Sequence, residues 1–296
     1  MRLATVTDVD LSAKRRVRVR EYPGSGTPVV MLHGLLDSSE GWHEVAARSE
    51  RPCYAIDLPG FGGSTCPPYE RIGSYARDVG QTLDRLGVDR YVLVGHSFGG
   101  AVASALVEQR PDDVAALVLI APAGYGRIAL AELAATPGIR QLVQAGLPLA
   151  LTNPVAMTAI YGLWVANGRR PDRALMDRCR KDAFRVIGGA RQALRTIVRC
   201  GIDKRAFFRR RVDFDGPVVA LWGDRDRLVP VRHADRVMTT FPQADVQVWE
   251  GMGHHPQRER IRPFCALLER ACRAAEPAPA TVAAPAAAEP GFGTAA

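Results

Sequence analysis

The sequence has 296 residues with 39 Lys and Arg against 31 Asp and Glu, a formal net charge of +8, and 47% of its residues are hydrophobic. This length and composition suffice for one large domain or two small ones with a sizeable core. No window approaches the roughly 18 consecutive apolar residues of a membrane-spanning helix, and no apolar signal segment follows the charges near the start. We therefore expect a cytoplasmic protein without a transmembrane segment.

The six cysteines form no CxxC pair and no cluster with histidines, which predicts neither a metal site nor a dense disulfide framework. The positive charge is concentrated in one segment. Residues 169–211 hold 15 Lys and Arg and four Asp, an excess of 11, which is more than the excess of the whole chain.

Strand and helix patterns alternate along most of the chain. The alternation of charge with valine in "RRVRVREY" predicts an edge strand with one solvated face over residues 15–22. Further strands are predicted within 28–34, 53–64, 91–95, 114–124, 217–226 and 245–251, and helices over 70–86, 98–110, 231–241 and 257–274. This order predicts an α/β fold with a mostly parallel central sheet flanked by helices, and with ligands bound at the carboxyl ends of the strands.

Two segments depart from this alternation. Residues 125–213 lack buried-strand patterns but contain helical stretches such as "ALAELAA", which predicts a helical lid inserted into one core formed by residues 1–124 and 214–275. Residues 276–296 are mostly Ala, Pro and Gly, which predicts a disordered tail.

The pattern G-x-S-x-G occurs at residues 95–99, "GHSFG", between an apolar strand pattern and an alanine-rich helix. In that context the pattern is typical of a nucleophile elbow, a strained turn that exposes a serine hydroxyl beside the amides that open a helix. Ser97 is therefore the candidate nucleophile, and the backbone N–H of Phe98 is a candidate donor to an oxyanion.

With these motifs, the chain up to about residue 274 resembles the α/β-hydrolase superfamily, in its lid-bearing branch of serine esterases and related hydrolases. The resemblance implies His254 as the base, in "GHHP", and Asp226 as the acid, in "WGDRDRLVP". It also implies the N–H of Leu35, after the His-Gly turn, as the second oxyanion donor. The order serine, aspartate, histidine is the one that this fold uses.

Neighbouring residues compete for two of these roles. His255 is an alternative base, but the favoured interpretation is that it is a partly exposed loop residue. Asp224 is expected to be solvated or to cap its loop. His33 and His96 are interpreted as structural, and Asp57 as an anchor for its own loop. No cofactor, metal or nucleic acid is implied, because no Walker loop, metal-ligand cluster or set of stacking aromatics is present.

The lid segment carries two further predictions. Some apolar side chains of this segment are candidates to line a substrate pocket, and the sequence does not select among them. The candidates are Leu147, Met157, Tyr161, Leu163 and Trp164. Arg191, Arg195 and Arg199 recur every four residues and form a basic helix face. A solvated face explains this pattern, and recruitment of an anionic substrate, a carrier protein or an acidic membrane surface is the alternative.

The sequence thus predicts a serine hydrolase that acts on a small-molecule carboxylic ester with an apolar acyl or alcohol part. A carbon–carbon bond hydrolase or thioesterase acting on a biosynthetic or aromatic-degradation intermediate would use the same triad and lid. A ligand-binding protein of the same fold with slow turnover is the third hypothesis. The segment after the His-Gly turn, "LLDS", is not glycine-rich, which favours the esterase.

Overall fold

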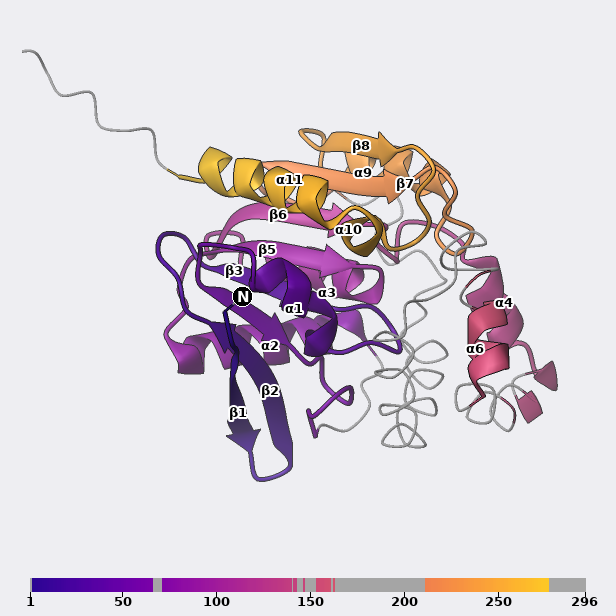
Figure 1. The fold of residues 1–296 in the computed structure, drawn as a ribbon, viewed down its shortest axis with the longest axis horizontal. Helices are drawn as coiled ribbons and strands as arrows, with labels where there is room; N and C mark the ends of the chain where they lie inside the picture. The colour runs from indigo at the N-terminus through magenta and orange to yellow at the C-terminus, as the bar shows by residue number, and fades with distance from the viewer. Residues whose placement is uncertain are drawn as a thin grey trace, which may run out of the picture.

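The computed structural model describes residues 2–65, 71–139, 141–142, 146, 153–160, 162 and 211–276, which form an eight-stranded sheet with helices on both faces (Figure 1). The strands are β1 (Thr5–Ser12), β2 (Arg15–Tyr22), β3 (Val29–Leu32), β4 (Cys53–Ile56), β5 (Tyr91–His96), β6 (Val114–Ile120), β7 (Val218–Gly223) and β8 (Asp245–Trp249). The helices are η1 (Ser39–Trp42), α1 (His43–Ala46), α2 (Ile72–Leu86), α3 (Phe98–Gln109), α4 (Ala129–Ala135), α6 (Pro154–Ile160), η3 (Val231–His233), α9 (Ala234–Thr240), α10 (Pro256–Glu259) and α11 (Ile261–Ala274).

The sheet has the strand order β1-β2-β4-β3-β5-β6-β7-β8. All pairs from β4 to β8 are parallel, and the two pairs that involve β2 are antiparallel. The predicted α/β class with a mostly parallel sheet is confirmed. Because the parallel strands point the same way, the loops that follow them gather at one edge of the sheet, where polar residues from distant parts of the chain can meet.

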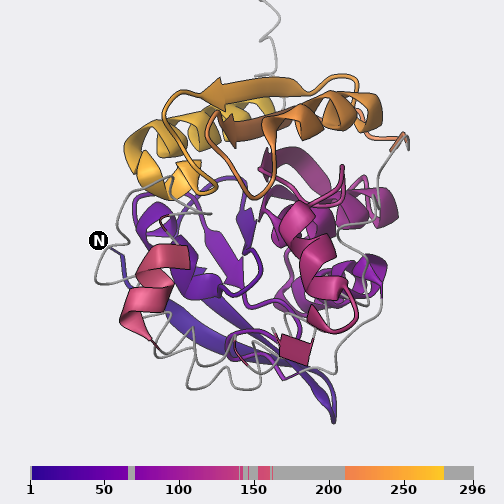
Figure 2. The ribbon, with the colours of Figure 1, turned by 90° about the vertical axis from the view of Figure 1, so that its right-hand side faces the viewer.

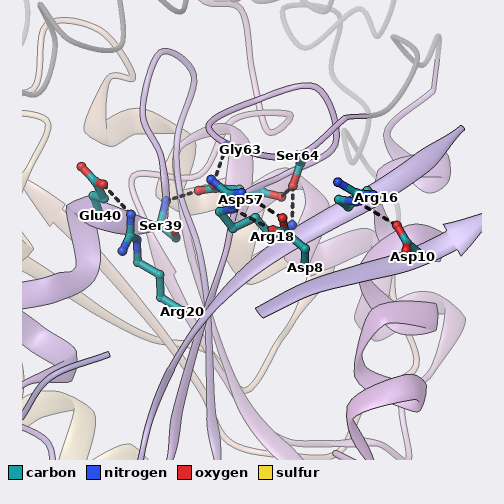
Figure 3. Close-up of polar contacts among 10 residues, drawn as sticks. All are labelled: Asp8, Asp10, Arg16, Arg18, Arg20, Ser39, Glu40, Asp57, Gly63 and Ser64. Atoms are coloured by element: carbon teal, nitrogen blue, oxygen red, sulfur yellow. Dashed lines mark hydrogen bonds and ion pairs between the residues drawn. The ribbon is translucent and has the colours of Figure 1, made fainter. Parts of the chain in front are cut away.

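The prediction that residues 15–22 form an edge strand is wrong, because β1 lies outside β2. The two strands form a hairpin in which Val9 lies opposite Val17 and both are buried. On the solvated face Asp8 and Asp10 of β1 form ion pairs with Arg18 and Arg16 of β2 (Figure 3). The charges that suggested a free edge are thus matched across the hairpin.

The core has two parts, one on each face of the sheet. All residues of β5 and β6 are buried, as expected for strands covered on both faces. Helices α2, α3 and α9 pack on one face, with Tyr75 and Phe98 in a perpendicular ring contact. Helices α1 and α11 cover the other face, where Phe264 packs near Trp42. This enclosure holds the carboxyl ends of the central strands in fixed positions.

The single helix predicted over residues 257–274 is divided into α10 and α11 at Arg260, which has φ −132° and ψ 68°. Pro263 accounts for the division, because proline lacks an N–H and its ring would collide with the carbonyl of residue 259 in a continuous helix. The break allows α10 to turn toward the sheet edge while α11 runs along the sheet face.

Two helices of the predicted lid lie within the described residues. Helix α4 coincides with the stretch "ALAELAA", and α6 is a second helix within the predicted lid segment. Both are placed beyond the carboxyl ends of the parallel strands, toward the right in Figure 1 and toward the viewer in Figure 2. The lid boundaries stay a prediction, since residues 163–210 lie outside the described part of the chain, as do residues 277–296 of the predicted tail.

Candidate active site

Ser97 lies in the turn between β5 and α3 with a strained backbone, at φ 53° and ψ −114°. A left-handed φ is unfavourable for a residue with a Cβ, so the surrounding structure must hold it. The Ser97 N–H donates to the carbonyl of Ile120 at 2.9 Å, and the Ser97 carbonyl accepts the N–H of Ala123 at 2.9 Å. The end of β6 therefore fixes the strained turn on both sides.

The glycines of the motif are needed because the elbow is packed against other backbone. A Cβ on Gly95 would lie 2.5 Å from the carbonyl oxygen of Gly99, and a Cβ on Gly99 would lie 2.4 Å from that of Leu32. A Cβ on Gly100 would lie 2.7 Å from the Cβ of Pro122. Such approaches are too short for any side chain, so the spacing of glycines reflects steric contact with β3 and the end of β6.

Phe98 is the first residue of α3, and Ser97 occupies the N-cap position. The first amides of a helix have no acceptor within the helix, so they are directed outward at its amino end. The structure thus places the Phe98 amide beside the candidate nucleophile, as the sequence predicts.

Asp226 and His254 are in direct contact. His254 Nδ1 lies 2.7 Å from Asp226 Oδ2, and both side chains are at most 3% exposed. The other oxygen, Asp226 Oδ1, accepts the N–H groups of Leu228 and Val229, both at 2.9 Å. These two amides orient the carboxylate, so His254 donates its Nδ1–H to Asp226 and its Nε2 is left as the basic nitrogen.

The loops that carry these two residues are joined by their backbones. The N–H of Arg225 donates to the carbonyl of Met252 at 3.0 Å, and a Cβ on Gly223 would lie 2.3 Å from that same oxygen. The carboxylate of Glu259 accepts the N–H of Gly253, at 2.9 Å for Oε1. The glycine before the acid is therefore required by the close approach of the histidine loop.

The competing residues behave as expected. Asp224 is exposed, and its Oδ1 accepts the N–H of Gly251 at 2.7 Å, which caps the loop after β8. His255 is half-buried at the start of α10. The carboxylate–imidazole contact in this part of the structure is the one between Asp226 and His254.

His96 joins the elbow to the histidine loop. Its Nε2 donates to the carbonyl of His254 at 2.9 Å, and its ring centroid lies 4.8 Å from that of His254 and 4.4 Å from that of His255. Burial, followed by the charges of the neighbouring histidines and of Arg258, lowers the pKa of His96 and of His255 well below the usual value. His96 is therefore a neutral donor that links the residue before Ser97 to the His254 loop, which agrees with a structural role.

The His-Gly turn after β3 packs directly against the elbow. His33 Nδ1 donates to the carbonyl of Gly34 at 2.7 Å, and its Nε2 accepts the N–H of Leu58 at 3.0 Å, which confirms the predicted bracing role. A Cβ on Gly34 would lie 3.2 Å from the Cβ of Ser97. Leu35 follows immediately, so the second candidate oxyanion donor belongs to a turn in contact with the nucleophile.

Asp57 anchors its own loop, as predicted, and it also contacts the loop that follows β3. Its Oδ1 accepts the N–H of Ser39 at 2.6 Å and its Oδ2 accepts the N–H of Gly63 at 2.7 Å (Figure 3). The Ser64 hydroxyl donates to the Asp57 carbonyl at 2.6 Å. One carboxylate thus holds together the loops that follow β3 and β4.

Several predictions concern residues outside the described part of the chain. They include the basic face of Arg191, Arg195 and Arg199, and the candidate lining residues Leu147, Tyr161, Leu163 and Trp164. Met157 lies in α6, but its side chain is outside the description. Recruitment of an anionic substrate or an acidic partner by this region stays a prediction.

Within the described residues, no group of three or more His, Cys, Asp or Glu is arranged to hold a metal ion. The same part of the chain contains no helix that is both long and apolar enough to cross a membrane.

Two residues near the site carry no motif signal in the sequence. Asp37 of the loop after β3 forms an ion pair with Arg258 of α10, 221 positions further along the chain. Neither position belongs to a recognised pattern, and a charge in a loop or a short helix is ordinarily solvated.

The family described as the alpha/beta hydrolase fold matches residues 27–154. An uncharacterized protein of Mycobacterium tuberculosis is 28% identical over 278 residues, which cover 88% of this chain and 80% of that protein. The mouse sn-1-specific diacylglycerol lipase is 25% identical over 258 residues, covering 80% of this chain and 78% of the lipase. A thermophilic esterase from Thermogutta terrifontis has a similar structure, with a TM-score of 0.71, 20% identity, and coverage of 93% of this chain and 99% of the esterase. Together with the strand order and the strained serine turn, these similarities show that the chain has the alpha/beta hydrolase fold.

Proposed function

We propose that the protein is a serine hydrolase that cleaves a carboxylic ester with an apolar acyl or alcohol part through an acyl-enzyme. The observation that carries this proposal is the 2.7 Å contact between His254 and Asp226, together with the hydrogen bond that joins the His254 carbonyl to His96, the residue before the strained Ser97. A serine hydroxyl is protonated at neutral pH, and this arrangement supplies the oriented base that it needs.

In the proposed reaction, His254 Nε2 takes the proton from Ser97 Oγ as the oxygen attacks the ester carbonyl. The amides of Leu35 and Phe98 stabilise the resulting oxyanion. His254 then gives the proton to the leaving alcohol, and an acyl group remains on Ser97. A water molecule, deprotonated by His254, attacks this acyl group and releases the acid. Asp226 stabilises the imidazolium at both stages.

Two observations support an apolar substrate. Leu36, beside the candidate oxyanion donor, is 40% exposed at the edge of the sheet where the site lies, and Leu133 of α4 is also exposed. A similar protein is named as a diacylglycerol lipase, and a diacylglycerol is an ester with apolar acyl chains.

The proposal is tested with Ser97→Ala and with Ser25→Ala, an exposed serine before β3 at the opposite end of the strands. Nitrophenyl esters of increasing acyl length, a thioester and a vinylogous diketone are assayed together with labelling by a fluorophosphonate. We expect ester hydrolysis and labelling in the wild type and in Ser25→Ala, and neither in Ser97→Ala. Faster cleavage of the thioester or the diketone than of every ester would overturn the ester assignment, and undiminished labelling of Ser97→Ala would overturn the nucleophile.

A further inference from the structure

The ion pair between Asp37 and Arg258 joins the two loops that the proposed reaction requires. Arg258 Nη2 contacts Asp37 Oδ2, and the side chains are 18% and 17% exposed, respectively. Asp37 follows the His-Gly turn by three residues, and Arg258 follows His254 by four. The pair is thus a direct polar link between the candidate oxyanion loop and the element after the candidate base.

On the oxyanion side, the chain between Leu35 and Asp37 is strained. Leu36 has a φ of 59°, in the left-handed region, which is unfavourable for a residue with a Cβ. The turn is held before Leu36 by the packing of Gly34 on Ser97. Asp37 holds it on the other side, so release of Asp37 allows Leu36 to relax and the adjacent Leu35 amide to move.

On the histidine side, Arg258 belongs to α10, which begins at Pro256 immediately after the two histidines. The Arg258 N–H donates to the His255 carbonyl at 2.9 Å, so the guanidinium and the histidine loop belong to one compact turn. The charge of Arg258 also acts on the buried His96 and His255, after burial and neighbouring histidines, in lowering their pKa. A shift of Arg258 would therefore move the turn that contains His255, which follows His254 in the chain.

Residue 41 leaves room for this pair because it is a glycine. A Cβ at Gly41 would lie 1.9 Å from Arg258 Nη2 and 2.7 Å from Asp37 Oδ1. The absence of a side chain at residue 41 leaves the space that the ion pair occupies, in a helical turn where alanine is otherwise favoured.

We propose that the Asp37–Arg258 ion pair is a positioning element for catalysis, which sets the Leu35 amide and the His254 imidazole relative to each other. This inference rests on the proposed serine hydrolase function. Both residues act through others, since neither is placed to touch the reacting atoms. Misplacement by about 1 Å of a group that acts in the transition state lowers the rate by about 100-fold, so loss of the pair should reduce kcat rather than substrate binding.

The test compares kcat and KM of Arg258→Met, Asp37→Asn and the double variant with a nitrophenyl ester. Gly41→Ala keeps both charges but displaces the guanidinium, and Arg258→Lys keeps one charge in a similar place. The matched control is Arg110→Met, which removes an arginine paired with Asp84 at the far end of α3 from the elbow. Thermal unfolding is measured for each variant.

We expect each single variant of the pair, and Gly41→Ala, to lower kcat by about 10- to 100-fold with KM changed by less than about threefold. The double variant should be no slower than the slower single variant, because both remove one interaction. Arg258→Lys should recover part of kcat, and Arg110→Met should stay within about twofold of the wild type.

Wild-type kcat in Arg258→Met and Gly41→Ala, or effects that multiply in the double variant, would overturn the positioning role. If Arg258→Met fails to fold, Gly41→Ala and Arg258→Lys decide the question, since wild-type kcat in both contradicts the inference. If the wild type hydrolyses none of the substrates and is not labelled at Ser97, the proposed function itself is refuted. This outcome needs only the wild-type protein, so it can be distinguished from failure of the positioning role.

Discussion

Replacement of Asp226 by Asn changes the proton arrangement of the candidate triad while it preserves the shape of the side chain. The amides of Leu228 and Val229, both at 2.9 Å, require an acceptor, so the Asn oxygen takes the place of Oδ1. The Asn NH2 group is then directed at His254 Nδ1, where the carboxylate oxygen lies at 2.7 Å in the wild type. Two donors cannot face each other, so His254 must place its proton on Nε2 and cannot accept the proton of Ser97.

This change of tautomer sets the expected magnitude. The same substitution in a serine protease triad lowers kcat by about 10⁴-fold, equivalent to about 5.4 kcal/mol of transition-state stabilisation. We expect a loss of this size in kcat for a nitrophenyl ester, with KM little changed because substrate binding does not involve Asp226. The midpoint of thermal unfolding should change little, since the backbone N–H donors keep their acceptor.

Asp224→Asn is the matched control. Asp224 is exposed, and an Asn oxygen can still accept the N–H of Gly251. We expect kcat within about twofold of the wild type. A kcat for Asp226→Asn above about one tenth of the wild-type value, or a larger loss in Asp224→Asn, would refute the assignment of the acid.

Three further predictions follow. His254→Ala should lower kcat by about 10⁴-fold or more and His255→Ala by less than about tenfold, measured with the same ester, and the reverse order would assign the base to His255. Burial lowers the pKa of His233 to about 4 from an ordinary 6.5, so the unfolded chain binds more protons between these values and stability falls as the pH decreases from 6.5 to 4. His233→Gln should therefore show a weaker decrease of the unfolding midpoint over that range, and an equal decrease would contradict this account. Gly99→Ala would place a Cβ 2.4 Å from a backbone carbonyl oxygen of β3, so it should lower the free energy of unfolding by about 1–3 kcal/mol or prevent folding. In Gly73→Ala the new Cβ meets only the end of a glutamine side chain at 3.1 Å, so the free energy of unfolding should stay unchanged or increase.

From β2 onward, the sequence by itself determined the order of the strands and of the longer helices of the core, and the residues that carry the motifs. Continuous apolar runs such as "YVLVG" predict buried strands because every side chain must be covered, and β5 and β6 are buried throughout. Ser97 could be chosen because the glycines around it form a motif within five consecutive residues, although the backbone that requires Gly99 and Gly100 comes from β3 and the end of β6. Asp226 and His254 could be chosen because each follows a strand in a pattern that the superfamily shares.

Tertiary structure alone decided which elements become neighbours. The position of β2 inside the sheet depends on the hairpin with β1, and the charges that suggested an edge are neutralised by that partner. The hydrogen bond from His96 to the His254 carbonyl and the ion pair of Asp37 with Arg258 join positions 158 and 221 residues apart. Local periodicity reports whether a side chain is buried or exposed, but the partner of a polar side chain is set by the packing of whole loops, so contacts of this kind have no signature in a single sequence.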